Sequence, residues 1–419
     1  MRILIVTAHF PPKNAIPSFR LYSFAYNWFK AGHNITVLTT SHNKNDNDLD
    51  FDCSIFNVLR SPVPYFSGLL SFSSNLDQNT KNQNIKKNAL YNILRFFKKM
   101  YMSISDNAQR FPSFFDLWAN KAVKLVNALD YDVVLSSGGP YSVHRIGLFL
   151  KKRNKKIKWI VDWRDLWTPP FKGFVLFKRY QINLERTFHK NADLITCVSE
   201  LCSKITSSMT ATPVKTVYNG FMPNDSVKNT NSVYKNNDKF TIVYTGNFYR
   251  NVQDPSPFLK AVSRIKKKNI DLYNKLEILF AGKNSDLIDL FRKNDISECY
   301  NFIGFIKYED SLSLQYNSDA VLFIDFADET ISGKMFEYMY YPKKIMAVGY
   351  NANSIAAEFI KMSNAGVYLG SDIDLIENYL IENIQDPKKY EYEKNYSFIN
   401  QFTRENQAAR MLDNILQLN

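Results

Sequence analysis

The sequence contains only four cysteines among its 419 residues, and their spacing matches no metal or redox motif. Cys53, Cys197, Cys202 and Cys299 form no CxxC pair, and Cys197 and Cys202 have no adjacent histidine. Zinc sites and disulfide frameworks require clustered cysteines. No acidic triplet suited to Mg²⁺ occurs either. We therefore expect neither a metal site nor a disulfide framework.

Long hydrophobic runs are also missing. No run approaches the roughly eighteen apolar residues that a membrane-spanning helix needs. The first apolar segment, Ile3–Ala8, is interrupted by His9 and Pro11, which is typical of a first buried strand and not of an export signal. We therefore expect a cytoplasmic protein that does not span the membrane.

Acidic residues are scarce in the first half of the chain. Residues 1–230 contain 15 Asp and Glu against 31 Lys and Arg, whereas the remaining residues contain 25 and 22. The net charge of +13 therefore originates in the first half, and we expect an anionic surface to face it. The basic residues concentrate at 84–104, 151–158 and 171–179. Segment 84–104 has helical apolar spacing that suits a bilayer interface, and equally a core-facing helix with a solvated basic side.

Strand and helix patterns alternate along the rest of the chain, which predicts an α/β fold with parallel sheets. A length of 419 residues exceeds what one hydrophobic core usually supports, so two domains are expected. Strands are expected near 3–7, 35–40, 133–136, 159–162, 194–198, 214–218, 240–245, 276–281, 300–304, 320–325, 344–348 and 366–369, and helices near 17–31, 117–129, 174–190 and 403–417.

The domain boundary is expected in the polar run 224–239, which has the composition of a linker. The predicted first domain covers 1–225 and includes an irregular insertion at about 41–112, which is long for a compact domain. The predicted second domain covers 226–402, and a helix at 403–419 closes the chain.

The segment Glu329–Glu337, ETISGKMFE, places two carboxylates around a Ser-Gly-Lys turn between a predicted strand and a predicted helix. Free backbone N–H groups and the positive end of the helix dipole gather near Gly333, with Lys334 beside them, which is an arrangement that binds anions. Each carboxylate can accept vicinal hydroxyl groups, so the segment suits a sugar, a diphosphate and a ribose in a row. Taken alone, the spacing also fits solvated residues at a helix start.

This segment and its neighbours resemble the donor-binding E-x7-E region of retaining nucleotide-sugar glycosyltransferases with two Rossmann domains, particularly glycosyltransferase family 4 and its close relatives. Other motifs agree in order along nearly the whole chain: MRILIVTAHFPP, YDVVLSSGGPYSVH, WIVDWRDLWTPP, NADLITCVSE, VYNGF, FTIVYTGNFYR, LEILFAGK and FIGFIKYED. The resemblance implies two Rossmann-like domains that face each other across a cleft (GT-B), with a C-terminal helix that crosses back onto the first domain.

By this resemblance the second domain binds the donor. Glu329, Arg250 and Lys334 are the expected catalytic residues, the two cations facing the leaving diphosphate. The expected donor-binding residues are Gly246, Asn247, Lys283, Phe305, Ile306, Ser332, Gly333 and Glu337. The nucleotide-sugar is a substrate, so no cofactor or metal is expected.

The sequence departs from the family at two places. Relatives usually carry a Lys about five residues after the Arg, whereas this chain has Gln253-Asp254, so Lys334 is expected to take more of the phosphate charge. On the acceptor side no GxGxxG occurs, and Arg164-Asp165 stands where many relatives have His-Asp. No general-base His is evident there, and a leaving phosphate can accept the proton instead. The acceptor-side candidates are Arg20, Tyr141, His144, Asp162 and Arg164; a lone His such as His144 is also typical of a structural residue.

We therefore expect a glycosyltransferase that transfers a sugar, with retention, from a UDP- or GDP-sugar to a glycan or lipid-linked glycan in bacterial surface polysaccharide (O-antigen or capsule) biosynthesis. Its expected location is the inner face of the cell membrane, with an anionic lipid surface as partner and no nucleic acid. The alternatives are a nucleotide-sugar epimerase of the same fold, which would need a proton-transfer set, and a non-enzymatic basic protein that binds membrane or nucleic acid.

Overall fold

The computed structural model describes residues 1–41, 49–64, 111–168, 177–224, 238–250, 252–282, 285–326 and 332–418. The chain forms two compact units: Met1–Tyr218 with Gln407–Asn419, and Asn219–Asn406. We call them unit 1 and unit 2 and describe each by itself. The division follows Tyr218, whereas the sequence patterns place it after residue 225.

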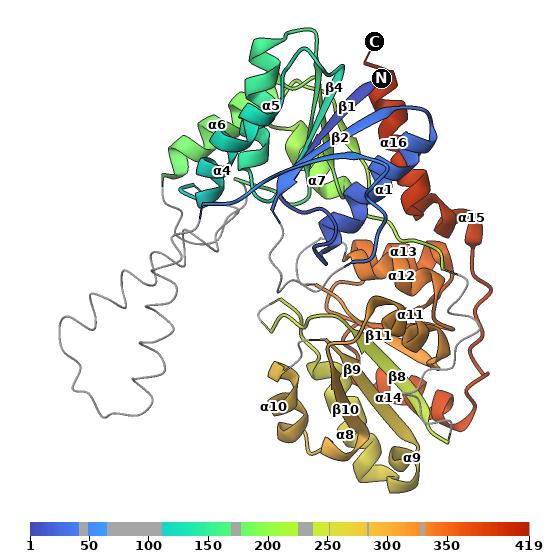
Figure 1. Ribbon diagram of the computed structural model, residues 1–419. Helices are drawn as coiled ribbons and strands as arrows, with labels where there is room; N and C mark the ends of the chain where they lie inside the picture. Colours follow the sequence, from blue (N-terminus) through green and yellow to red (C-terminus); the bar gives the residue numbers. More distant parts are fainter. Residues whose placement is uncertain are drawn as a thin grey trace, which may run out of the picture. The chain divides into compact units, whose positions relative to one another are not determined.

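In its described residues, unit 1 contains a seven-stranded parallel sheet of order β3-β2-β1-β4-β5-β6-β7 (Figure 1). The chain crosses over between most strands through a helix, as parallel pairing requires. The strands are β1 (Arg2–Val6), β2 (Asn34–Thr40), β3 (Asn57–Ser61), β4 (Val133–Ser137), β5 (Lys158–Trp163), β6 (Leu194–Cys197) and β7 (Val214–Thr216). The helices are α1 (Ile16–Lys30), α4 (Phe114–Ala122) with the short η1 (Val123–Leu125), α5 (Ser142–Arg153), α6 (Lys178–Asn191), α7 (Glu200–Ser207) and α16 (Arg404–Leu416).

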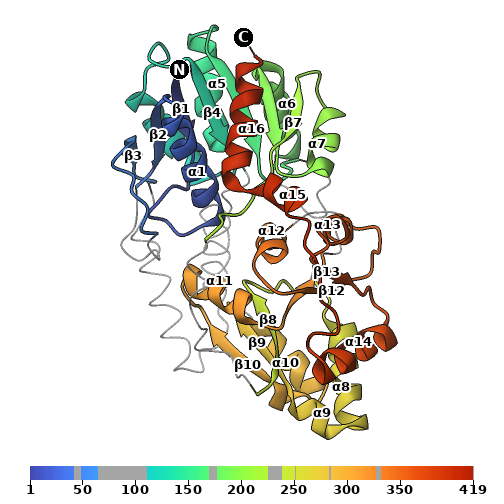
Figure 2. The same cartoon turned by 90° about the vertical axis from the view of Figure 1, so that its right-hand side faces the viewer.

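Helices cover both faces of this sheet, so its central strands are apolar on both sides. One core contains Trp118 of α4, Ile146 of α5 and Phe188 of α6. The opposite core contains Phe24 and Trp28 of α1 together with Met411 of the C-terminal helix α16 (Figure 2). The Trp28 indole N–H donates to the Ala408 carbonyl at 2.9 Å, which fixes α16 to α1. The end of the chain thus completes the core of unit 1.

Unit 2 contains, among its described residues, a six-stranded parallel sheet of order β10-β9-β8-β11-β12-β13. The strands are β8 (Phe240–Thr245), β9 (Leu276–Ala281), β10 (Tyr300–Gly304), β11 (Ala320–Ile324), β12 (Ile345–Val348) and β13 (Gly366–Tyr368). The helices are α8 (Ser256–Lys268), α9 (Ile270–Asn274), α10 (Ser285–Lys293), α11 (Tyr308–Asn317), α12 (Gly333–Tyr340), α13 (Ile355–Ser363), α14 (Ile373–Gln385) and α15 (Tyr396–Ile399). Both units are therefore Rossmann-like α/β folds, as the sequence predicts.

One element differs from the expectation. The region 41–112, predicted to be irregular, contains the edge strand β3 at Asn57–Ser61, which pairs in parallel with Thr36–Thr40 of β2. β3 has only two apolar residues, Val58 and Leu59, so neither alternation nor a buried run identifies it. The membrane expectation depends on segments 84–104 and 171–179. All of the first and residues 171–176 of the second lie outside the described residues.

Candidate functional site

Three neighbouring strands of unit 2 end at glycines with positive φ. Gly246 follows β8 (φ +88°), Gly282 follows β9 (φ +130°) and Gly304 ends β10 (φ +81°). A side chain is strained in this backbone conformation, whereas glycine adopts it freely. A Cβ atom on Gly282 would lie 2.4 Å from the Gly246 carbonyl oxygen, and one on Gly246 would lie 2.5 Å from Cε of Lys334. The glycines therefore let the loops and Lys334 meet at the carboxyl edge of the sheet.

Lys334 lies at the start of α12, where the Ser332 hydroxyl caps the helix by accepting from the Lys334 backbone N–H. Its ammonium donates to the Tyr244 hydroxyl at 3.2 Å and to the Asn247 carbonyl at 3.4 Å, and lies 4.3 Å from the centroid of the Tyr244 ring. Desolvation lowers the pKa of Lys334 to about 7, although Glu337 opposes this shift. A phosphate beside the ammonium would restore its charge, so the arrangement suits an anion.

Glu337 lies one turn further along α12 and is half-buried. Its Oε1 accepts a hydrogen bond from the Tyr308 hydroxyl at 2.9 Å. Desolvation raises the pKa of Glu337, while Arg404, Tyr308, Gln315 and Lys334 act in the opposite direction. Tyr308 and Arg404 could not be predicted from the sequence, because both are distant from Glu337 in the chain and neither belongs to a motif around it. Tyr308 thus holds the carboxylate in place, and a carboxylate is suited to accept hydroxyl groups of a ligand.

Gln253 is buried and holds the loop after β8 against β11. Its side-chain amide donates to the Ile324 carbonyl at 2.7 Å, and its oxygen accepts from the Tyr249 N–H at 3.1 Å and the Tyr244 hydroxyl at 3.3 Å. Gln253 therefore fixes Tyr244, the residue that holds Lys334. The Gln253 side chain therefore has a structural role at this edge of the sheet, and Lys334 carries the positive charge beside it.

The remaining donor-side candidates are distributed along the same edge. Arg250 and Asn247 are exposed on the loop after β8, Phe305 is 63% exposed after β10, and Ile306 is half-buried. Ser332 and Gly333 begin α12. Glu329 and Lys283 lie outside the described residues. The roles of all of these residues remain predictions.

In unit 1, Arg20 and Asp162 are buried and bonded to each other. Their side chains are 1% and 0% exposed, with Nη2 and Oδ1 2.9 Å apart. Asp162 also accepts from Ser137 at 2.7 Å and Thr196 at 2.8 Å, and Arg20 donates to the Tyr218 carbonyl at 2.6 Å. Burial alone would raise the pKa of Asp162, but Arg20 and the hydroxyls lower it overall. These bonds hold both side chains inside the unit, and their acceptor role stays a prediction.

Tyr141 and His144 are buried as well, and their acceptor role also stays a prediction. The Tyr141 hydroxyl donates to the Asp116 carboxylate at 2.6 Å, and its ring stacks on Trp167 with centroids 4.6 Å apart. His144 Nδ1 lies 2.8 Å from Ser136 Oγ, and burial lowers the pKa of His144 to about 3, so the imidazole is neutral. Asp116, which no motif indicated, organises this region.

Arg164 remains half-buried at the end of β5, with its guanidinium donating to the carbonyls of Gly138 and Gly139. Burial lowers the pKa of Arg164 to about 10. His9, just after β1, is its neighbour: burial, and then the charges of Lys13 and Arg164, lower the pKa of His9 to about 3. In the sequence, His9 is noticeable only because it interrupts an apolar run. The carboxyl edge of unit 1 thus presents His9 and Arg164.

Comparisons with known proteins agree with this geometry. The family model described as "Glycosyl transferases group 1" matches residues 226–398. This match covers the strand-end glycines, Lys334 and Glu337. The match and the fold agree with the expected glycosyltransferase activity, whereas membership of family 4 and the retaining outcome stay predictions.

Solved structures with the same fold span the entire chain of this glycosyltransferase. Sucrose-phosphate synthase from Thermosynechococcus elongatus is 14% identical, with a TM-score of 0.65 over 100% of this chain and 99% of that one. Anabaena HepE, solved with UDP and glucose, is 12% identical, with a TM-score of 0.61 and the same coverage. The lipopolysaccharide outer core galactosyltransferase WaaB is 12% identical, with a TM-score of 0.55 over 100% and 99%. At these identities the likeness shows the fold. No curated protein matches the sequence.

Proposed function

We propose that this glycosyltransferase takes a sugar from a nucleotide-sugar donor, bound by unit 2, and transfers it with retention to a glycan acceptor. The observation that carries this proposal is Lys334, whose ammonium lies between the Tyr244 ring and the Asn247 carbonyl beside the capped start of α12. A helix start and a desolvated ammonium together favour a diphosphate. Glu337 then accepts the ribose hydroxyls, and Phe305 and Ile306 contact the base.

The proposed chemistry places charge on the leaving diphosphate. The bond between the anomeric carbon and the phosphate oxygen breaks, a bond from that carbon to the acceptor oxygen forms on the same face, and the acceptor proton moves to the diphosphate. Lys334 and Arg250 stabilise the charge that develops. Glu329 is assigned to the sugar. Because the diphosphate takes the proton, the buried neutral His144 is not needed as a base.

The proposed donors are UDP- or GDP-sugars, and the proposed acceptor is a lipid-linked glycan in surface polysaccharide assembly. Two structural relatives support this choice, since HepE was solved with UDP and glucose and WaaB is a lipopolysaccharide galactosyltransferase. The basic first half supports peripheral contact with an anionic membrane. No helix in the described part of the chain is long and apolar enough to cross a bilayer.

A thermal-shift screen tests the donor proposal. UDP-, GDP-, dTDP- and CMP-sugars are added to the wild-type protein and to Lys334→Met, because a ligand that binds the folded state raises the melting temperature by mass action. We expect one base to stabilise the wild-type protein and to have little effect on Lys334→Met. Absence of stabilisation by every nucleotide-sugar would contradict donor binding at this site.

A further inference from the structure

Three cavities lined by described residues differ in chemistry. A groove of about 610 Å³ lies between α4–η1 and α5 in unit 1, and its apolar lining includes Val123, Val126, Ile146 and Leu150. Its charged lining consists of Lys124, Arg145 and Arg153, with no Asp or Glu among the described residues that line it. The other two cavities, of about 530 and 340 Å³, are lined by Lys and Arg together with one carboxylate each. This carboxylate is Glu200 in the larger cavity and Asp295 in the smaller one. Of these three cavities, only the α4–α5 groove combines an apolar lining with charged residues that are all cations.

The three cations that line this groove differ in whether they form an ion pair. Arg145 is paired with Asp116 at 2.9 Å and belongs to the fold. Lys124 and Arg153 form no ion pair with any described residue; the Arg153 guanidinium instead lies 4.6 Å from the centroid of the Phe149 ring. Phe149 itself is 40% exposed. An exposed aromatic ring below an unpaired guanidinium offers one ligand both an apolar contact and a positive charge.

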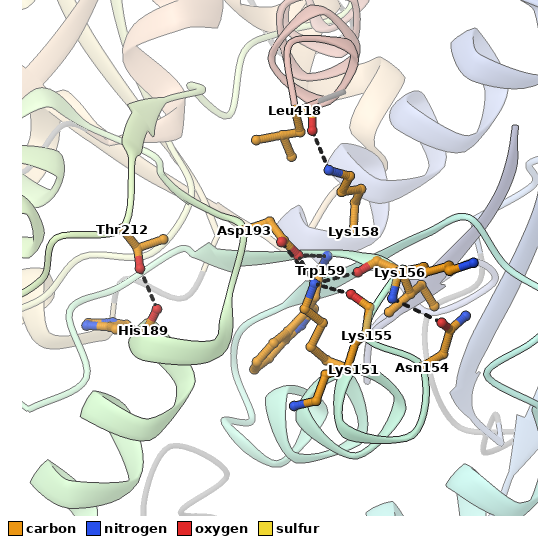
Figure 3. Close-up of polar contacts among 11 residues, drawn as sticks. Lys151, Asn154, Lys155, Lys156, Lys158, Trp159, His189, Asp193, Thr212 and Leu418 are labelled. Atoms are coloured by element: carbon orange, nitrogen blue, oxygen red, sulfur yellow. Dashed lines mark hydrogen bonds and ion pairs between the residues drawn. The ribbon is translucent and has the colours of Figure 1, made fainter.

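The basic segment 151–158 at the end of α5 also contains both bonded and exposed cations (Figure 3). Lys151 donates to both oxygens of Asp193 at 2.9 and 2.7 Å, and Lys158 donates to the Leu418 carbonyl, so both hold unit 1 together. Lys152, Arg153, Lys155 and Lys156 are exposed. The exposed apolar residues Leu125 (49%) and Leu129 (69%) follow α4 nearby in the chain. Unpaired cations and exposed apolar side chains therefore gather at this end of unit 1.

We propose that the α4–α5 groove binds an anionic phospholipid of a membrane surface, with the phosphate between Lys124 and Arg153 and the lipid's apolar part on Phe149 and the Val123 side. This inference rests on the membrane association in the proposed function and gives it a site. Other occupants fit the charge less well. The chain's own segment 65–110 carries seven Lys and Arg and only two Asp, and a second copy of the protein carries +13. Both would repel the groove.

Vesicle sedimentation tests the groove. Phosphatidylcholine vesicles with and without phosphatidylglycerol are mixed with the wild-type protein, with Lys124→Glu/Arg153→Glu, and with the control Lys260→Glu/Lys267→Glu, which changes the charge equally at the unit 2 cavity. A well-placed cation contributes about fivefold to binding, so reversing two should lower phosphatidylglycerol-dependent binding by about 25-fold or more. The control should change it by less than about threefold. Circular dichroism confirms that each variant is folded.

Two further measurements distinguish a phospholipid from an acidic peptide as the ligand. Phe149→Ser should weaken vesicle binding about fivefold even at high salt, because the loss is apolar and is not screened. Binding of a polyglutamate peptide that depends on Lys124 and Arg153 but not on Phe149 would instead show an acidic-peptide site and overturn the proposal. So would equal losses in both double variants, or a wild-type protein that ignores phosphatidylglycerol at low salt. Donor-dependent thermal stabilisation is measured in parallel, so failure here is separable from failure of the transferase proposal.

Discussion

The carboxyl edges of the two sheets use their charged residues differently. In unit 1, Arg20 and Asp162 neutralise each other and are closed off from solvent, with side chains 1% and 0% exposed. In unit 2, the Lys334 ammonium is hydrogen-bonded to no carboxylate of the described residues and instead contacts a tyrosine and a carbonyl. A charge that is already paired stabilises the fold, whereas a charge held by neutral groups remains available to a ligand. This contrast supports the proposal that unit 2 binds the donor.

Breaking the Arg20–Asp162 pair should have the largest effect. Arg20→Met leaves the Asp162 carboxylate buried without its cation, which should lower the free energy of unfolding of unit 1 by about 3–5 kcal/mol. All five tryptophans, the last at position 167, lie in unit 1, so urea unfolding followed by tryptophan fluorescence reports on this unit alone.

The matched control is Arg2→Met, which removes a similar Arg–Asp pair whose side chains are 53% and 45% exposed. It should leave the unfolding midpoint nearly unchanged, because exposed pairs are screened by water. Equal unfolding midpoints for Arg20→Met and the wild-type protein would show that the Arg20–Asp162 pair does not stabilise unit 1.

Removing the Lys334 charge should lower turnover by about a hundredfold, because the cation faces charge that develops on the leaving diphosphate. Initial rates of Lys334→Met are compared with those of Lys361→Met, which removes an exposed lysine from α13. Arg250→Ala should show a smaller loss of the same kind. Wild-type turnover in the double variant Lys334→Met/Arg250→Ala would contradict the claim that the cations of unit 2 act on the donor.

Glu337→Gln should weaken nucleotide binding by about 1–3 kcal/mol, since hydrogen bonds to a charged group have this magnitude. Calorimetry with the nucleoside diphosphate measures the loss, and Glu358→Gln, an exposed carboxylate of α13, serves as the control. Unaltered affinity in a folded Glu337→Gln protein would show that the ribose is held elsewhere.

Tyr308→Phe should have a smaller effect, because it removes only the hydroxyl that donates to Glu337 at 2.9 Å. We expect donor affinity to fall about fivefold, the size of one hydrogen bond of about 1 kcal/mol, with turnover at saturation little changed. Tyr350→Phe is matched to it, since the Tyr350 hydroxyl donates to Asp254 at 2.6 Å in the same unit. A similar loss in both variants would indicate a general effect on stability.

The fold was predictable because it depends on local patterns, and local motifs also indicate the donor-side candidates, whose roles stay predictions. The strands β8, β9 and β10 were predicted with the bounds that the structure has, since each is a short apolar run followed by a turn. The supporting contacts were not predictable. Tyr308 meets Glu337, and Gln253 meets Ile324, through tertiary packing that no spacing in the chain encodes. On the acceptor side, polarity at strand ends suggested exposure, yet Arg20 and Asp162 satisfy each other inside the unit.

The most direct test of the donor assignment is the pH dependence of nucleotide-sugar affinity, measured by calorimetry at about pH 6 and about pH 8. The pKa of Lys334 is lowered to about 7, so its ammonium is mostly charged at the lower pH and mostly neutral at the higher one. The diphosphate diester of a nucleotide-sugar does not titrate between these values. Wild-type affinity should therefore fall about tenfold as the pH rises, and Lys334→Met should bind weakly at both values. An affinity that is independent of pH in the wild-type protein and unchanged in Lys334→Met would contradict the account.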